Sequence, residues 1–176
     1  MHQAKKLGEF EMPPAWPLPE PWLLEIGRMT LLWATLEASV NLYIAKLLGF
    51  NDQFDARPAI ATAHANFKQR QDILSTLCEQ LHDQYPVLED YERVVKMIDA
   101  ASKSRNKFVH GSLTLDPDTQ QVNLARLAAR GKLQVTVEAV RLNDIRQVSK
   151  KIHSANLALH NLVTGTSYLT LWGVKP

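Results

Sequence analysis

A run of apolar residues at alternating steps of four and three constrains this chain more than any other feature. It predicts one long helix from about Trp22 to Leu48, with a single coiled-coil-like seam made of Trp22, Ile26, Met29, Trp33, Leu36, Val40, Tyr43 and Leu47. A second set of apolar residues adjoins this seam and comprises Leu24, Leu31, Ala38, Leu42 and Ala45. We therefore expect this helix to be covered on two sides, either at the centre of the fold or at a dimer interface.

The same spacing predicts three further helices, at about residues 58–85, 86–109 and 145–169. Between the last two, the period changes to two, because Leu133, Val135 and Val137 alternate with polar residues. Asp116-Pro117-Asp118 is typical of a turn. The sequence thus predicts a mainly α protein, a four-helix up-and-down bundle with a small antiparallel β excursion at about 112–140 before the last helix.

The 176 residues are enough for one domain, which we place at residues 22–176. Residues 1–21 form a proline-rich arm that we expect to be extended, because proline removes hydrogen-bond donors and fixes φ. A single cysteine and the absence of a secretory or membrane-spanning stretch favour a cytoplasmic protein without membrane contact. A net charge of +2 is too small to indicate a nucleic-acid binder by itself, so partners must be inferred from local features.

The segment with the strongest chemical character ends the third predicted helix. Arg105 occupies a seam position that should be apolar, and a buried guanidinium needs a partner, for which Glu37 of the first helix is the favoured candidate. At 100° per residue, Asn106 and His110 lie about 40° apart on the helix surface, whereas Arg105 and His110 lie about 140° apart. A fixed cation, an amide and a titratable imidazole in one region can bind a phosphate and move a proton.

The segment Arg105-Asn106-Lys107-Phe108-Val109-His110-Gly111 resembles the R-x(4-6)-H motif of HEPN domains, helical proteins that include many metal-independent endoribonucleases. The polar residue directly after the arginine is typical of that motif. The resemblance implies a homodimer with the motif helices facing each other, RNA as the substrate, and no metal or cofactor. Arg105 and His110 would be catalytic with Asn106 in support, and a toxin or defence role would imply a cognate antitoxin protein as a partner.

An alternative is a non-catalytic HEPN-like module that binds nucleotides or a partner protein, with Arg105 in an internal salt bridge. Lys103 and Lys107 flank the motif as candidate phosphate contacts, although lysines on a helix are commonly only solvated. A second basic group lies in the β segment at Arg126, Arg130 and Lys132. Cys78 with His82 forms too small a set for a metal site, and His153 and His160 are expected on a polar or partly buried face of the last helix.

Overall fold

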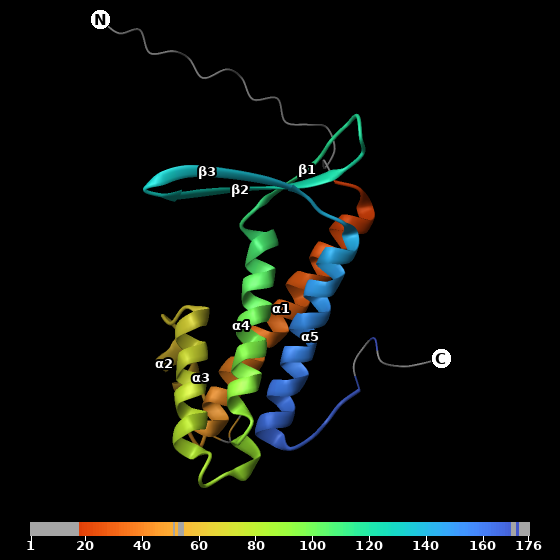
Figure 1. The fold of residues 1–176 in the computed structure, drawn as a ribbon. Helices are drawn as coiled ribbons and strands as arrows, with labels where there is room; N and C mark the ends of the chain where they lie inside the picture. The colour runs from red at the N-terminus through yellow and green to blue at the C-terminus, as the bar shows by residue number, and fades with distance from the viewer. Residues whose placement is uncertain (1–17, 51, 53–54, 170–171, 173–176) are drawn as a thin grey trace, which may run out of the picture.

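The computed structural model describes residues 18–50, 52, 55–169 and 172, and these form a mainly helical protein with one small antiparallel sheet (Figure 1). The helices are α1 (Glu20–Leu47), α2 (Arg57–Thr62), α3 (Phe67–Leu81), the 3-10 turn η1 (Pro86–Leu88), α4 (Tyr91–Val109) and α5 (Leu142–Thr164). The strands are β1 (Ser112–Leu115), β2 (Val122–Arg130) and β3 (Lys132–Ala139). No helix in this part of the chain is both long enough and apolar enough to cross a membrane.

The predicted first helix is confirmed as α1, which begins at Glu20 with Pro21 in its first turn. The expected arm therefore ends before Glu20 rather than at Pro21, because proline in the first helical turn loses no intrahelical bond. The rest of the arm, residues 1–17, lies outside the described residues. The predicted seam of α1 is buried at Met29, Trp33, Leu36, Val40 and Tyr43.

The second apolar face of α1 is not covered by the residues that the structure describes. Leu24, Leu31 and Leu42 expose 63%, 72% and 56% of their surface. The expectation that neighbours cover α1 on two sides is thus not met by the helices of a single chain.

The predicted second helix is two helices, α2 and α3, separated by four residues. Asn66 ends the interruption because its side chain accepts a 3.0 Å hydrogen bond from the Gln69 amide, while the Gln69 side chain accepts one of 2.8 Å from the Asn66 amide. This reciprocal capping box starts α3 afresh.

The helices do not follow an up-and-down order. Trp33 packs on Phe67 and Asn41 accepts a hydrogen bond from Arg70, so α1 and α3 run in the same direction. Gln71 of α3 donates a hydrogen bond to the carbonyl of Val95 in α4. α4 runs antiparallel to α3, and α5 returns parallel to α1 (Figure 1). The predicted alternation fails between α1 and α3, because Phe67 at the start of α3 packs on Trp33 in the middle of α1.

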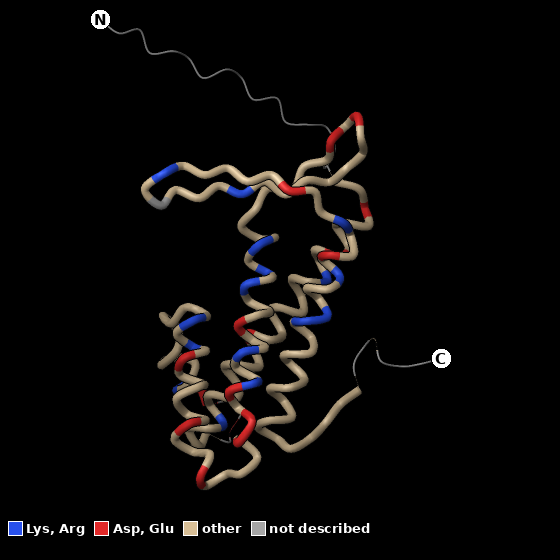
Figure 2. Tube along the Cα trace, in the orientation of Figure 1, with Lys and Arg blue, Asp and Glu red and all other residues tan. Residues whose placement is uncertain are grey.

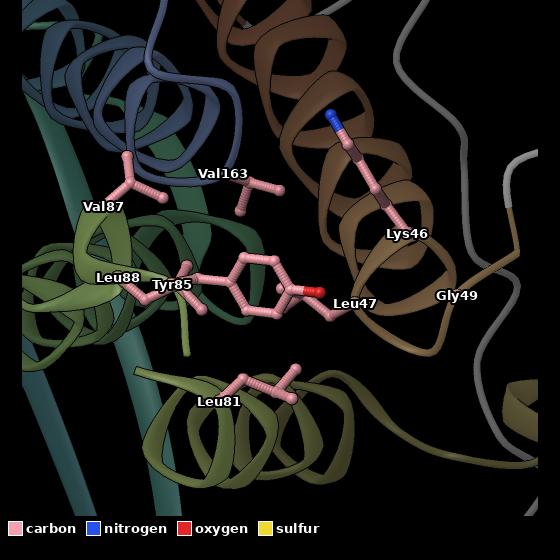
Figure 3. A pocket seen from close by; sticks show the side chains of 8 residues that line it. All are labelled: Lys46, Leu47, Gly49, Leu81, Tyr85, Val87, Leu88 and Val163. Carbon is pink, nitrogen blue, oxygen red and sulfur yellow. The ribbon is translucent and has the colours of Figure 1, made fainter. Parts of the chain in front are cut away.

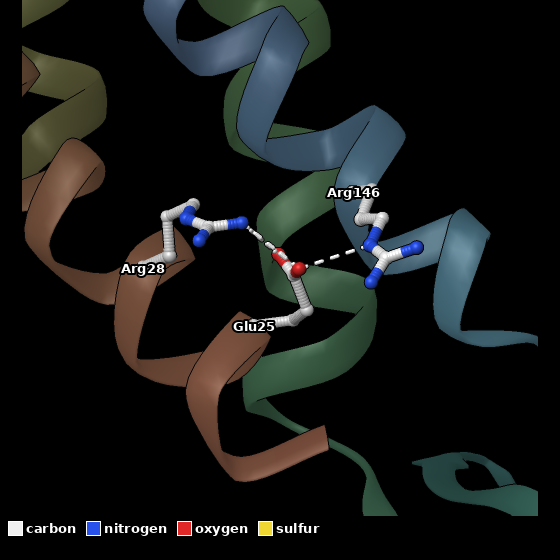
Figure 4. A network of polar contacts seen from close by, with 3 residues as sticks. All are labelled: Glu25, Arg28 and Arg146. Carbon is white, nitrogen blue, oxygen red and sulfur yellow. Dashed lines mark hydrogen bonds and ion pairs between the residues drawn. The ribbon is translucent and has the colours of Figure 1, made fainter. Parts of the chain in front are cut away.

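A buried carboxylate ties the start of α1 to the start of α5. Glu25 is only 5% exposed and accepts hydrogen bonds of 2.9 Å from Arg28 and from Arg146 of α5 (Figure 4). Both arginines are half exposed, so two solvated cations compensate one buried anion.

The β excursion is confirmed as a three-stranded antiparallel sheet in the order β1-β2-β3. Asp116 makes the β1–β2 turn, since its carboxylate accepts 3.0 Å bonds from the amides of Asp118 and Thr119, and these bonds lower its pKa. Gly131, at φ +76°, joins β2 to β3. Only the first half of β2 pairs with β1, so the outer part of β2 and β3 projects as a hairpin at the end of α4 (Figure 1).

Candidate functional site at the end of helix α4

The motif segment lies where α4 meets the sheet. Val94, Ile98, Ala101 and Phe108 of α4 are buried as the seam predicts. His110 is the C-terminal cap residue, and its backbone N–H donates to the Asn106 carbonyl. The His110 side chain is exposed and makes no hydrogen bond or ion pair with any other described residue. Its imidazole is therefore available to a ligand.

Arg105 is half-buried rather than largely buried, and it turns toward α1. Its guanidinium lies 5.2 Å from the centre of the Trp33 ring, a cation–π distance. Its Nη1 donates a 3.0 Å hydrogen bond to the side-chain oxygen of Asn106, while its buried Nε has no partner among the described residues. Arg105 is thus held by an aromatic ring and an amide.

The predicted ion pair between Arg105 and Glu37 is absent from the ion pairs of the described residues, so this prediction is wrong for the single chain. Glu37 is partly exposed on α1 and water can solvate its carboxylate. The Trp33 ring and the Asn106 side-chain oxygen lie against the Arg105 guanidinium in place of a carboxylate. The buried carboxylate of α1 is instead Glu25.

An open groove of about 510 Å³ lies between the end of α4 and the projecting hairpin. The α4 side is formed by Lys103, Asn106, Lys107 and His110. The hairpin side is formed by Arg126, Leu127, Ala128, Gln134 and Thr136. The structure therefore brings four of the predicted site residues together in one groove, whereas Arg105 does not line it. Figure 2 shows Lys and Arg on both α4 and the hairpin in this region.

The two candidate lysines of α4 already have acidic partners. Lys103 lies 2.6 Å from Asp99, one turn earlier on the same helix. The Lys107 ammonium donates a 3.0 Å hydrogen bond to Glu138 of β3, and Arg126 lies 3.4 Å from the other oxygen of Glu138. One carboxylate is thus shared by two cations, which leaves this part of the groove positive.

Gly111 fixes how the sheet meets α4. A Cβ at this position would collide with the Leu124 side chain and would lie 3.1 Å from the Lys107 carbonyl and 3.2 Å from the Ala125 carbonyl. Glycine is generally favoured just past a helix C-terminus. The structural reason is the close approach of β2, which only a residue without a side chain permits.

The other histidines in the described part of the chain do not line this groove. Tyr43 of α1 hydrogen-bonds His160 on α5, and burial raises the pKa of Tyr43. His153 is buried against Trp172, and burial lowers its pKa. Cys78 is fully buried, and the described residues contain no group of three or more side chains suited to a metal ion.

A second pocket lies at the opposite end of α4 from His110. It has a volume of about 270 Å³, and its lining is mostly aliphatic, with Lys46 and Tyr85 as the polar side chains (Figure 3). Leu88 of η1 lines it, so the length of α4, roughly 28 Å at 1.5 Å per residue, separates it from the motif. It is not part of the groove at the end of α4.

Sequence reasoning did not identify Gln134, Thr136 and Glu138 as site residues. They were visible only as the polar half of an alternating strand. The feature that could have identified them is the position of Arg126, which pairs with Thr136 on the same polar face of the hairpin.

The fold and the groove define a mainly helical protein with a polar, partly basic site where a helix end meets a β hairpin. The chain matched no protein-family model, no curated protein and no solved structure in comparisons with each. The resemblance to HEPN domains therefore depends on the sequence motif at residues 105–111.

Proposed function

We propose that this protein is a metal-independent endoribonuclease of the HEPN kind, acting in the groove at the end of α4. The observation that carries the proposal is the exposed, unpaired imidazole of His110 beside Asn106 and three cationic side chains in one groove. An imidazole can accept and donate a proton, and cationic side chains can bind the phosphate on which it acts.

The proposed reaction is attack of the ribose 2′-oxygen on the adjacent phosphorus. The new 2′-O–P bond forms as the P–O5′ bond breaks, which gives a 2′,3′-cyclic phosphate and a 5′-hydroxyl end. His110 takes the proton from the 2′-hydroxyl or gives one to the leaving 5′-oxygen. Asn106 orients the phosphate or the imidazole.

The proposed active form is a C₂ homodimer. Each chain contributes a unit of four long helices, α1, α3, α4 and α5, and the C-terminal ends of the two α4 helices lie close together. The exposed α1 stripe of Leu24, Leu31 and Leu42 supports a partner copy, because large apolar side chains gain free energy when water is removed from them. Pairing would supply two histidines, one as base and one as acid. In that arrangement we expect Arg105 to stabilise the phosphate, as the resemblance implies.

A second candidate is a non-catalytic module for nucleotides or a partner protein. The observation that favours it is the position of Arg105, which lies against Trp33 and does not line the groove. In this reading Arg105 is a structural residue. A toxin role with a cognate antitoxin partner in the cytoplasm belongs only to the first candidate.

The chemistry of the products tests the first candidate. Incubation with single-stranded RNA in EDTA should give 2′,3′-cyclic phosphate and 5′-hydroxyl ends. An oligonucleotide with a single 2′-deoxy substitution at the cleavage site should stay intact there, because the nucleophile is missing. Cleavage only with added divalent metal, or with 3′-hydroxyl ends, would refute the proposal.

A further inference from the structure

The hairpin wall of the groove carries a polar face, of which the proposed chemistry uses only the positive charge of Arg126. We propose that the inner face of the β2–β3 hairpin binds the sugar-phosphate strand of single-stranded RNA, through Arg126, Gln134 and Thr136, and that Glu138 competes with RNA phosphate for Lys107 and Arg126. This inference rests on the proposed function, because it assigns the substrate contacts of that same groove.

The two faces of the hairpin differ sharply. Arg126 pairs directly with Thr136 and Ala128 with Gln134 in the ladder, so these four side chains share one face, the face that lines the groove. By strand register the opposite face carries Leu127 against Val135, although Leu127 also lines part of the groove. Leu124 lies on the same face of β2 as Arg126 and Ala128, and it is fully buried where β2 packs on the core. The face that lines the groove is therefore turned toward the helices.

The charges of the groove suit a phosphodiester. Glu138 Oε2 accepts a hydrogen bond from Lys107, but its Oε1 lies 3.4 Å from Arg126 without a hydrogen bond and is otherwise unpaired. Arg126 is therefore held loosely, and its side chain is 45% exposed. A phosphate entering the groove can take the place of the Glu138 carboxylate between these two cations.

The uncharged groups of the groove suit the sugar and the base edges. Thr136 offers a hydroxyl and Gln134 an amide, the groups that bind ribose 2′-hydroxyls and base edges. The imidazole of His110 is the single aromatic ring among the residues that line the groove, so base stacking contributes little. The groove has a volume of about 510 Å³, which is within the range of small-molecule sites and suits one nucleotide.

The groove also places the strand correctly for the proposed reaction. His110 lines the same groove as Arg126 and Thr136, from the opposite wall. A strand held by the hairpin therefore passes the imidazole. The predicted binding is salt-dependent and only weakly selective for base.

The test measures RNA affinity by fluorescence anisotropy in EDTA, in a His110→Ala background so that the labelled oligonucleotide stays intact. Arg126→Gln should weaken RNA binding about three- to tenfold. It should also reduce the slope of log K against log salt concentration by about 0.7, the value expected for the loss of one phosphate contact with a single strand. Thr136→Val should weaken it less. Glu138→Gln should tighten binding about threefold, because it releases both cations, and a gain cannot come from damage to the fold.

Lys132→Gln is the matched control, since it removes one positive charge from the same hairpin at an exposed position that does not line the groove. It should change affinity less than twofold. Three results would overturn the inference. They are equal losses of RNA affinity with Lys132→Gln and Arg126→Gln, no gain in affinity with Glu138→Gln, and the absence of RNA binding.

Wild-type cleavage separates this inference from the proposed function. Cleavage that depends on His110 but ignores the hairpin variants would leave the function standing and overturn the hairpin contacts. Opposite affinity changes in the Arg126 and Glu138 variants, without any cleavage, would support the hairpin contacts and refute the nuclease.

Discussion

Arg105 donates a 3.0 Å hydrogen bond to the side-chain oxygen of its neighbour Asn106. Asn106 lines the groove beside His110, whereas Arg105 lies on the other side of α4 against Trp33. Arg105 therefore orients the amide of the groove even where its own guanidinium does not reach the groove. Any effect of Arg105 in a single chain passes through Asn106.

Arg105→Lys tests whether the guanidinium is needed. Lysine keeps the charge but cannot stack a planar group on Trp33 and bond Asn106 at once. RNA cleavage should fall about 10²-fold, while the free energy of unfolding changes by about 1 kcal/mol or less. Cleavage at the wild-type rate, measured beside urea unfolding of the same preparation, would show that the positive charge alone suffices.

Gly111→Ala tests the docking of the sheet on α4. The new methyl group would meet Leu124 and two backbone carbonyls, so the sheet must shift. Unfolding should become easier by about 1–3 kcal/mol, and cleavage should fall because the hairpin wall moves. Gly27→Ala is the matched control, since nothing lies within 4 Å of its added Cβ. There stability should stay the same or rise, and a similar loss at both positions would contradict the account.

The Glu25 network predicts an asymmetry. Glu25→Ala leaves two arginines that are half exposed and can turn to water, so the free energy of unfolding should fall by only about 1–2 kcal/mol. The double substitution Arg28→Met with Arg146→Met leaves a buried carboxylate unpaired and should cost about 3–5 kcal/mol. Urea unfolding measures both. A double variant no less stable than Glu25→Ala would mean that Glu25 is more solvated than its 5% exposure indicates.

The uncovered face of α1 predicts where two copies meet. Leu31→Glu should convert a dimer into a monomer in sedimentation equilibrium at micromolar concentrations, with an unchanged circular dichroism spectrum. Leu133→Glu is a close control, because both leucines are 72% exposed and only Leu31 lies on α1. A wild-type monomer, or equal dissociation by both variants, would contradict an interface through α1.

The helices whose apolar residues keep a regular period could be predicted from the sequence. α1, α4 and α5 follow the four-three spacing, although α4 begins at Tyr91 rather than near residue 86, after η1. α5 ends at Thr164 rather than near residue 169, because Gly165 adopts φ +69°. The break between α2 and α3 was missed, although Asn66 followed by Gln69 three residues later is a capping-box signature. Periodicity alone carries no information about helix direction, so the parallel arrangement of α1 and α3 could not be predicted.

The candidate site could be predicted on its helix but not on its opposite wall. The helical angle correctly placed Asn106 and His110 in one groove. Arg105 was assigned a carboxylate partner because a cation–π contact with Trp33 leaves no charge pattern in the sequence. Glu25 was overlooked because an acidic residue near a helix start is commonly a solvated group that favours the helix dipole. The hairpin contribution depends on how the sheet meets α4, which is a tertiary property.

The most direct test of the central claim is the rate of single-stranded RNA cleavage in EDTA by wild type, His110→Ala and His64→Ala. His64 is an exposed histidine that does not line the groove and serves as the matched control. Wild type and His64→Ala should cut at equal rates, and His110→Ala should be slower by about 10²- to 10⁴-fold, the usual contribution of general acid–base catalysis. Equal rates for all three proteins, or RNA left equally intact by all three, would contradict the assignment of this groove as a ribonuclease site.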